Sequence, residues 1–248
     1  MIPRIIHQTW KSPDIPEHLR EFQQSWRILH PEFEYRLWTD ADNDRLIHDD
    51  YPQFVEFFHR ISQPITKVDF IRVAYMHRFG GIYADVDFEA LRPFDPLLND
   101  SKIVVGRETG GIGNPMRGRD FVLNALIISP AGHPVWLEIM NEIATRYRHR
   151  RMFEPLAFYV IRMAIEVFDH VLEKHARDHD DITIEPHEMF YPAPPSVRLV
   201  QTRRELARDC GSFAIHHYEN SWFGIRNRLA NIFLRRSELR NASRKEPG

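Results

Sequence analysis

The sequence predicts an α/β fold in which a mixed β-sheet is flanked by helices. At the start of the chain, short apolar stretches typical of buried strands alternate with longer stretches whose apolar residues recur at helical spacing. Further β-rich stretches follow, and this continuation favours a mixed sheet. The 248 residues contain no obvious linker, internal repeat or low-complexity segment, so a single main domain is expected.

The first elements follow from the apolar pattern. Residues 4–10 have a pair of isoleucines at their centre and are expected to form a buried strand. A helix is expected over residues 16–29, where the apolar positions lie at helical spacing: Leu19, Phe22, Trp26 and Leu29. Residues 35–38 predict a second strand, and residues 51–60 predict another helix.

A longer helix is expected over residues 64–79. Its apolar positions again lie at helical spacing: Ile65, Val68, Ile71 and Tyr75. Pro64 suits the first turn of a helix, and Gly80 suits the left-handed conformation that ends one. Asp69 and Arg72 are three positions apart, so they are neighbours on the surface of this helix.

Residues 80–87, with the sequence GGIYADVD, are the most informative stretch of the chain. If the apolar run is a strand, Asp85 and Asp87 face the same way while Val86 points into the core. Two carboxylates on one face repel each other unless a cation lies between them. Such ligands suit Mg²⁺ or Mn²⁺, which would keep positions open for phosphate oxygens. The alternative is a solvated loop with two surface acids.

The preceding helix would bring a basic side chain to the same place. Alone, Asp69 and Arg72 would form a surface ion pair of small value. Because the helix runs straight into the expected strand, Arg72 should lie near the cation. Its guanidinium could there hold a carboxylate or a phosphoryl oxygen in bidentate fashion.

The later elements continue the α/β pattern. Strands are expected at residues 102–106, 121–128, 182–184 and 213–216. Helices are expected at residues 134–148 and at about 155–174. In folds of this class, ligands bind at the carboxyl ends of the strands.

These motifs resemble those of a known family. The run from Asp69 to Asp87 resembles glycosyltransferase family 32, whose members carry a DxD sugar-binding motif and are distantly similar to the glucosylating domains of clostridial toxins. Matching blocks follow the same order elsewhere: residues 2–11, 35–40, 91–97, 124–134 and 216–222. The resemblance implies a GT-A domain, a Rossmann-like nucleotide-sugar-binding fold, over residues 1–222.

The resemblance also implies an activity. Members of the family are retaining, metal-dependent transferases, so this chain is expected to use Mn²⁺ or Mg²⁺. The implied reaction moves a hexose from a UDP- or GDP-hexose to a hydroxyl of a glycan, glycolipid or polysaccharide, in α-linkage. A divalent cation suits this chemistry because negative charge develops on the departing diphosphate.

The same resemblance implies the site residues, position by position. Those expected to take part in transfer are Asp69, Arg72, Asp85, Asp87 and Asn124. Asp87 would be the main metal ligand and Asp85 its partner. Asp69 and Arg72 would orient the donor. Asn124 is followed by Ala125, where the family often has an acidic residue or glycine, and this departure leaves the donor sugar open.

Contacts to the nucleotide and the metal are expected from both ends of the chain. The implied nucleotide contacts are Gln8, Thr9, Trp10, Tyr83, Asp85, Ser221 and Trp222. Trp10 could instead be a core aromatic residue. His216 and His217 are candidate further metal ligands, since neutral imidazole often binds metal. Adjacent strand residues face opposite ways, so one of the two is expected to reach the metal, and the sequence leaves open which.

Composition limits the other classes of function. The net charge of −2 argues against a nucleic-acid partner. The single cysteine, Cys210, excludes an internal disulfide framework and fits a reducing compartment. No signal peptide or long apolar run is apparent, which predicts a cytoplasmic protein, acting at the inner face of the membrane if it binds lipid.

The basic tail, residues 223–248, supplies the predicted membrane contact. Its apolar residues at helical spacing are flanked by arginines: Leu229, Ile232 and Phe233. Such a helix can lie on an anionic membrane surface as a peripheral contact. The alternative is a terminal helix docked on the domain by its apolar stripe.

Two other functions compete with the transferase. A catalytically inactive relative would bind sugar without transfer, although the intact Asp69, Arg72 and DxD motif argue against it. A haloacid-dehalogenase-type phosphatase also uses DxD at a strand end. It normally has a hydroxyl residue two places after the motif, where this chain has Glu89.

Overall fold

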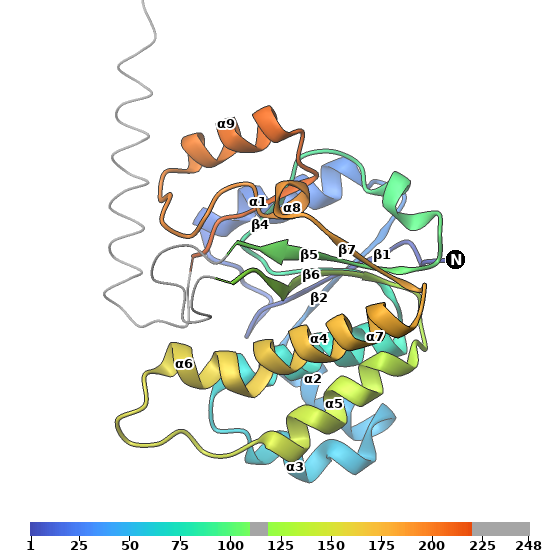
Figure 1. Ribbon diagram of the computed structural model, residues 1–248, viewed down its shortest axis with the longest axis vertical. Helices are drawn as coiled ribbons and strands as arrows, with labels where there is room; N and C mark the ends of the chain where they lie inside the picture. The colour runs from blue at the N-terminus through green and yellow to red at the C-terminus, as the bar shows by residue number, and fades with distance from the viewer. Residues whose placement is uncertain (110–118, 220–248) are drawn as a thin grey trace, which may run out of the picture.

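The computed structural model describes residues 1–109 and 119–219. Within these residues, six strands form one sheet in the order β2-β1-β3-β6-β5-β7. The strands are β1 (Ile5–Thr9), β2 (Glu34–Trp38), β3 (Gly81–Ala84), β5 (Ile103–Glu108), β6 (Phe121–Ser129) and β7 (Ile182–Glu185). Helices cover both faces of the sheet (Figure 1). The predicted α/β fold with a mixed sheet is confirmed.

The directions of the strands determine which strand ends lie at the same edge of the sheet. β1 is parallel to β2 and to β3, whereas β6 is antiparallel to both of its neighbours, β3 and β5. β7 is parallel to β5. The carboxyl ends of β1, β3 and β5 therefore share one edge of the sheet with the amino end of β6.

The helices form two layers around this sheet (Figure 1). On one side lie α1 (Glu17–Leu29), α8 (His187–Phe190) and α9 (Val200–Cys210). On the other side lie α2 (Asp40–Asp50), α3 (Val55–Arg60), α4 (Pro64–Arg78), α5 (Pro134–Arg146), α6 (Leu156–Val160) and α7 (Glu166–Asp178). Two short 3₁₀ segments, η1 (Pro52–Phe54) and η2 (Asp95–Leu98), and a π-helical turn, η3 (Ile161–Ile165), complete the described helical elements.

Each face of the sheet has its own apolar core. Ile82 belongs to the core that contains Trp26 of α1, whereas the next residue, Tyr83, belongs to the core that contains Phe70 of α4. This separation follows from the alternation of side chains along a strand. Consecutive residues of β3 thus join the two helical layers to the sheet.

Two glycines allow α4 to pass directly into β3. Gly80 and Gly81 have φ values of +63° and +93°, in the region that other residues rarely adopt. A Cβ on Gly81 would lie 2.4 Å from the Ile5 carbonyl oxygen, so a side chain there would push β1 away. The left-handed position predicted for Gly80 is confirmed.

A second, two-stranded sheet lies beyond the end of β3. It pairs β4 (Phe88–Ala90) with β8 (Ala214–His216) in antiparallel register, with Phe88 opposite His216. This pairing brings the end of the described chain beside the segment that follows β3.

Several local expectations were wrong. β3 ends at Ala84, so Asp85 and Asp87 lie in a turn between β3 and β4, closed by a 2.9 Å hydrogen bond from the Phe88 N–H to the Asp85 carbonyl oxygen. Residues 51–60 form η1 and α3, not one helix. The elements α2, α8, α9 and β4 were not predicted. α2 is polar, and its start is marked by a capping box between Thr39 and Asp42.

Some predictions fall on residues that the structure does not describe. These are Ser221, Trp222 and the tail 223–248, so the domain boundary at residue 222 stays a prediction. Among the described helices, none is both long and apolar enough to cross a membrane.

Candidate active site

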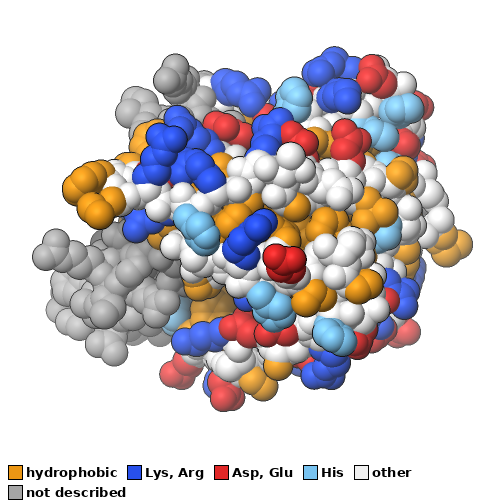
Figure 2. All heavy atoms as spheres, turned by 90° about the horizontal axis from the view of Figure 1, so that it is seen from below, with side chains coloured by type: hydrophobic (Ala, Val, Ile, Leu, Met, Phe, Trp, Pro, Cys, Tyr) orange, Lys and Arg blue, Asp and Glu red, His pale blue; other side chains and the backbone are white. Residues whose placement is uncertain are grey.

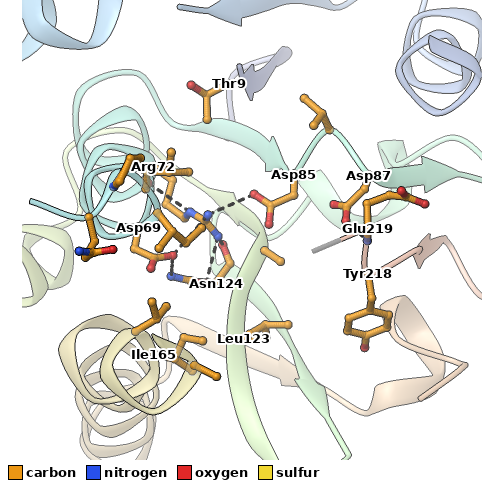
Figure 3. Close-up of a pocket in the computed structure, with 18 of the residues that line it drawn as sticks. Thr9, Asp69, Arg72, Asp85, Asp87, Leu123, Asn124, Ile165, Tyr218 and Glu219 are labelled. Carbon is orange, nitrogen blue, oxygen red and sulfur yellow. Dashed lines mark hydrogen bonds and ion pairs between the residues drawn. The ribbon is translucent and has the colours of Figure 1, made fainter. Parts of the chain in front are cut away.

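A cavity of about 1320 Å³ opens at the carboxyl edge of β1 and β3. The described residues that line it include most of the predicted site: Thr9, Trp10, Asp69, Arg72, Asp85, Asp87, Asn124 and His216. Figure 3 shows Asp69, Arg72 and Asn124 close together, with the carboxylates of Asp85 and Asp87 beside them. The turn between β3 and β4 therefore keeps both carboxylates on the cavity side, although it is not a strand.

Arg72 is the centre of a buried hydrogen-bond network. Its Nη2 lies 3.3 Å from Asp69 Oδ1 and 3.2 Å from Asp85 Oδ1. Its Nη1 donates to the carbonyl oxygen and to Oδ1 of Asn124, at 2.9 and 3.0 Å. The guanidinium also lies over the Tyr83 ring, 4.9 Å from its centroid. Arg72 is thus a buried positioning residue and not a surface ion-pair partner.

One carboxylate oxygen of Asp69 accepts a hydrogen bond within the protein, and the other has no partner in the described structure. Oδ1 accepts from Asn124 Nδ2 at 3.0 Å, whereas Oδ2 is buried and has no hydrogen-bond partner among residues 1–109 and 119–219. Burial raises the pKa of Asp69 to about 6, although the charge of Arg72 and the bond from Asn124 oppose the rise. Asp69 is one of the residues that line the cavity, and an unpartnered carboxylate oxygen can accept a hydrogen bond from a ligand hydroxyl.

Because the pKa of Asp69 is raised in the folded protein, ionisation of this carboxyl should lower the unfolding free energy at neutral pH. The folded state holds this proton up to about pH 6, against an ordinary value of 3.8, so the favourable contribution is complete below the ordinary value and is lost as pH rises through about 6. The unfolding free energy of the wild type, minus that of Asp69→Asn, should fall by on the order of 2 kcal/mol between about pH 4 and pH 7. Urea unfolding of both proteins across this range measures it. A constant difference would contradict the prediction.

Asp85 and Asp87 lie in different surroundings. Asp85 accepts a 2.5 Å hydrogen bond from the Tyr83 hydroxyl, and burial raises its pKa despite the opposing charge of Arg72. Asp87 Oδ2 accepts from the Glu219 N–H at 2.8 Å, and its Oδ1 lies 3.3 Å from His216 Nε2. Burial alone would raise the pKa of Asp87, but the charge and hydrogen bond of His216 outweigh it and lower the value to about 2.

Asp85, Asp87 and His216 form a group that fits a divalent cation. One ligand atom from each lies within 4.8 Å of the other two. Two carboxylate oxygens and one imidazole nitrogen suit Mn²⁺ or Mg²⁺, with the cavity side open for ligand oxygens. The His216 ring is held by stacking on Phe88, at 4.7 Å and 6°, and its backbone carbonyl accepts from Arg203 at 2.8 Å.

The two adjacent histidines face opposite ways, as the alternation of a strand predicts. His217 Nε2 lies 2.9 Å from Glu89 Oε2, and its ring stacks on Phe22 at 3.9 Å. In the described structure His217 is therefore directed away from the Asp85–Asp87 pair, and His216 is the histidine grouped with it.

The residues expected to contact nucleotide divide into two sets. Thr9 and Trp10 line the cavity. Gln8 and Tyr83 are fully buried behind it, and both bond to Asp85: Gln8 Nε2 donates to its carbonyl oxygen at 3.2 Å. In this structure Gln8 and Tyr83 support the carboxylate turn and do not lie on the cavity wall.

Sequence reasoning missed several residues that line the cavity, among them Glu108, Tyr218 and Glu219. Glu108 is the last residue of β5, whose predicted end at residue 106 was two residues short. Burial raises its pKa to about 7, with the charge of His216 opposing the rise. Its position as an acidic residue at the carboxyl end of a buried strand could have identified Glu108 as a candidate site residue.

A second group of possible ligands lies at the opposite edge of the sheet. Asp181 accepts from His133 and His175, at 3.1 and 3.3 Å, and His133 Nδ1 accepts from the Val135 N–H at the start of α5. These hydrogen bonds account for the group without an ion, because they tie the beginning of β7 to α5 and α7.

The fold is that of GT-A glycosyltransferases. A family model described as "glycosyltransferase sugar-binding region containing DXD motif" matches residues 16–104. The matched region contains the DxD segment on which the predicted resemblance rests.

Similar proteins agree with this assignment. The chain is 36% identical over 143 residues to the mannosyl phosphorylinositol ceramide synthase SUR1 of Saccharomyces cerevisiae, covering 58% of this chain and 35% of that protein. It is 27% identical to the initiation-specific alpha-1,6-mannosyltransferase of Candida albicans over 172 residues, covering 60% and 45%. The chain therefore spans about a third to a half of the length of these relatives.

A solved structure supports the fold. The PaToxG glycosyltransferase resembles this chain with a TM-score of 0.53 at 14% identity, covering 72% of each chain. At this identity the likeness concerns the fold alone, and it confirms the GT-A prediction.

Proposed function

We propose that the protein is a metal-dependent, retaining hexosyltransferase that uses a nucleotide-diphosphate sugar. The acceptor is a hydroxyl of a glycan, glycolipid or polysaccharide, and the new linkage is α. One observation carries the proposal: the buried Arg72 network lies directly beside the group formed by Asp85, Asp87 and His216. Sugar recognition and diphosphate binding would then share the Asp85 carboxylate.

The described residues supply distinct parts of the reaction. Asp85, Asp87 and His216 would hold Mn²⁺ or Mg²⁺, which when bound offsets the negative charge that develops on the diphosphate. Asp69 Oδ2 would accept a hydrogen bond from a hydroxyl of the donor hexose. The N–H groups of Arg72 donate to acceptors within the protein, so the proposed role of Arg72 is to fix the positions of the Asp69 and Asp85 carboxylates.

Thr9 and Trp10 would contact the nucleotide, because they line the cavity where β1 ends. Retention fits attack on the face from which the diphosphate departs, with a diphosphate oxygen taking the acceptor proton. The carboxylates nearest the proposed sugar position already have positioning roles. Asp85 is bonded to Tyr83 and Arg72, while Asp69 is bonded to Asn124 through Oδ1 and would hold a donor hydroxyl through Oδ2. This arrangement favours positioning over covalent catalysis.

The names of the relatives suggest the first substrates to test. SUR1 is by name a mannosyl phosphorylinositol ceramide synthase and the Candida albicans relative is by name a mannosyltransferase, so mannose from GDP-mannose and a glycolipid acceptor lead the candidates. A cytoplasmic location at the inner face of the membrane, with contact through residues 223–248, is part of the same proposal.

Removal of metal is expected to abolish the activity. The test is nucleotide release from GDP-mannose and from UDP-linked glucose, galactose and N-acetylglucosamine, with Mn²⁺, with Mg²⁺ or with EDTA. At least one donor should release nucleotide with metal, and EDTA should stop it reversibly. Tight donor binding without turnover would favour the inactive relative. Release of phosphate from p-nitrophenyl phosphate, with no sugar nucleotide used, would favour the phosphatase.

A further inference from the structure

Three exposed large apolar side chains of the described structure lie close together in one segment of the chain. Residues 147–155 join α5 to α6, and in this loop Met152 is 84% exposed and Phe153 is 92% exposed. Phe158, in the first turns of α6, is 45% exposed. Single exposed apolar residues are normal on proteins, but adjacent ones so fully exposed indicate an interaction surface.

The loop is held in a fixed shape from within. Glu154 accepts two hydrogen bonds from the Arg148 guanidinium, at 2.8 and 2.5 Å, and one from the Arg151 N–H at 3.3 Å. Arg150 Nη1 donates to the Glu154 carbonyl oxygen at 2.6 Å. The hydroxyl of Tyr159, a buried residue of α6, donates to the Arg148 carbonyl oxygen at 2.8 Å. These hydrogen bonds fix the backbone of the loop, so Met152 and Phe153 project from a segment of defined shape.

The charge of the loop is not balanced. Arg148 is neutralised by Glu154, but Arg150 and Arg151 are exposed, and neither forms an ion pair with a carboxylate in the described part of the chain. In Figure 1 the loop projects beyond the helices at one end of the molecule. Figure 2 shows hydrophobic and Lys or Arg side chains next to one another at the left edge of this helical face.

The loop also borders the apolar side of the cavity. Residues 156–158 line the cavity, and its apolar wall continues along the same helical segment to Ile165. Figure 3 shows Ile165 close to Asn124 of the Arg72 network. Ile61 and Ile65 contribute apolar surface from the α3–α4 region. An apolar path thus connects the loop with the candidate active site.

We propose that residues 148–158, which comprise most of this loop and the first turn of α6, bind the surface of an anionic lipid bilayer. Met152 and Phe153 enter the headgroup region, while the guanidiniums of Arg150 and Arg151 pair with lipid phosphates. A protein partner would need a matched pocket for the two apolar tips, whereas a fluid interface accepts a projecting tip without one. Residues 148–158 are a different part of the sequence from the basic tail, residues 223–248, for which membrane contact is also proposed.

Docking in this way would turn the apolar side of the cavity toward the membrane. A lipid with a hydroxyl-bearing polar head is then the acceptor class that reaches Asn124 most directly. That last step rests on the proposed transferase function, whereas the membrane contact itself does not.

Co-sedimentation of the full chain with vesicles tests the proposal. Vesicles of phosphatidylcholine alone are compared with vesicles that also contain phosphatidylserine, and no sugar nucleotide is added. The double variant Met152→Ser/Phe153→Ser should bind the anionic vesicles about tenfold more weakly than the wild type. Arg150→Glu/Arg151→Glu should lose at least as much, and high salt should remove the difference between that variant and the wild type.

Matched controls lie on the opposite helical layer. Ile28→Ser in α1 removes an apolar side chain that is 73% exposed, and Arg208→Glu in α9 reverses an exposed charge. Both should bind like the wild type. Equal binding by all variants, or no binding by the wild type, would overturn the proposal. A change of oligomeric state in Met152→Ser/Phe153→Ser, measured by light scattering, would assign the loop to a second copy of the chain instead.

Discussion

Asp87→Asn is expected to lower the rate of sugar transfer by at least about a hundredfold at saturating donor and Mn²⁺. The new amide can still accept from the Glu219 N–H, so the turn between β3 and β4 should keep its shape. It carries no charge, however, and offers the cation a much weaker ligand beside Asp85 and His216. Turnover measured by nucleotide release, and Mn²⁺ affinity measured by calorimetry, should fall together.

A matched control separates this effect from general damage. Asp181 also pairs with histidine, but at the opposite edge of the sheet, so Asp181→Asn should leave turnover and Mn²⁺ affinity near the wild-type values. Near-wild-type turnover of Asp87→Asn would refute the proposed metal group. Loss of turnover in both variants would indicate that the substitutions damage the folded structure, and not that Asp87 acts by binding the ion.

The pKa of Asp87 also fixes the sign of its effect on stability. Its pKa is lowered to about 2, so its contribution is present above the ordinary value of 3.8 and is lost as pH falls through about 2. Asp87→Asn should therefore reduce the unfolding free energy at neutral pH, by on the order of 2 kcal/mol. Relief of repulsion between the two carboxylates would have the opposite sign.

Arg72→Met is expected to destabilise the protein by about 3–5 kcal/mol. The methionine fills similar space, but it leaves the buried carboxylate of Asp69 and the partly buried carboxylate of Asp85 without the cation that compensates them. A loss of this size should lower the melting temperature by roughly 10 °C for a chain of this length. Thermal unfolding of the purified protein measures it directly.

Companion variants make the result specific. Arg72→Lys keeps the charge but not the forked geometry, so it should lose less stability than Arg72→Met while still losing most of its turnover. Asp69→Asn should recover part of the loss when combined with Arg72→Met, because one stranded charge is removed. A loss below about 1 kcal/mol in Arg72→Met would show that the network does not stabilise the fold.

The fold was predictable where the pattern was long. The helix expected at 64–79 is α4, at Pro64–Arg78, because its apolar spacing and its Pro and Gly boundaries agree. Short elements were not predictable in the same way. β4 has three residues and exists because β8, distant in sequence, pairs with it. No local pattern in Phe88–Ala90 reports that pairing.

The composition of the candidate site was more predictable than its geometry. Local motifs pointed to Asp69, Arg72 and the DxD pair, and the structure places them around one cavity. Whether His216 or His217 faces that cavity depends on the register between β8 and β4, which only the folded chain defines. The burial of Gln8 behind the cavity likewise depends on which face of β1 the helices cover.

The β4–β8 pairing has a consequence for how the site comes into being. His216 is 129 positions beyond Asp87 in the sequence, yet the proposed ion needs both of them, together with Asp85. A nascent chain that has not yet released β8 from the ribosome holds the carboxylate turn without its imidazole. Pairing of β8 with β4 is therefore the step that completes the proposed metal site. We expect affinity for the ion to appear only after this pairing has formed.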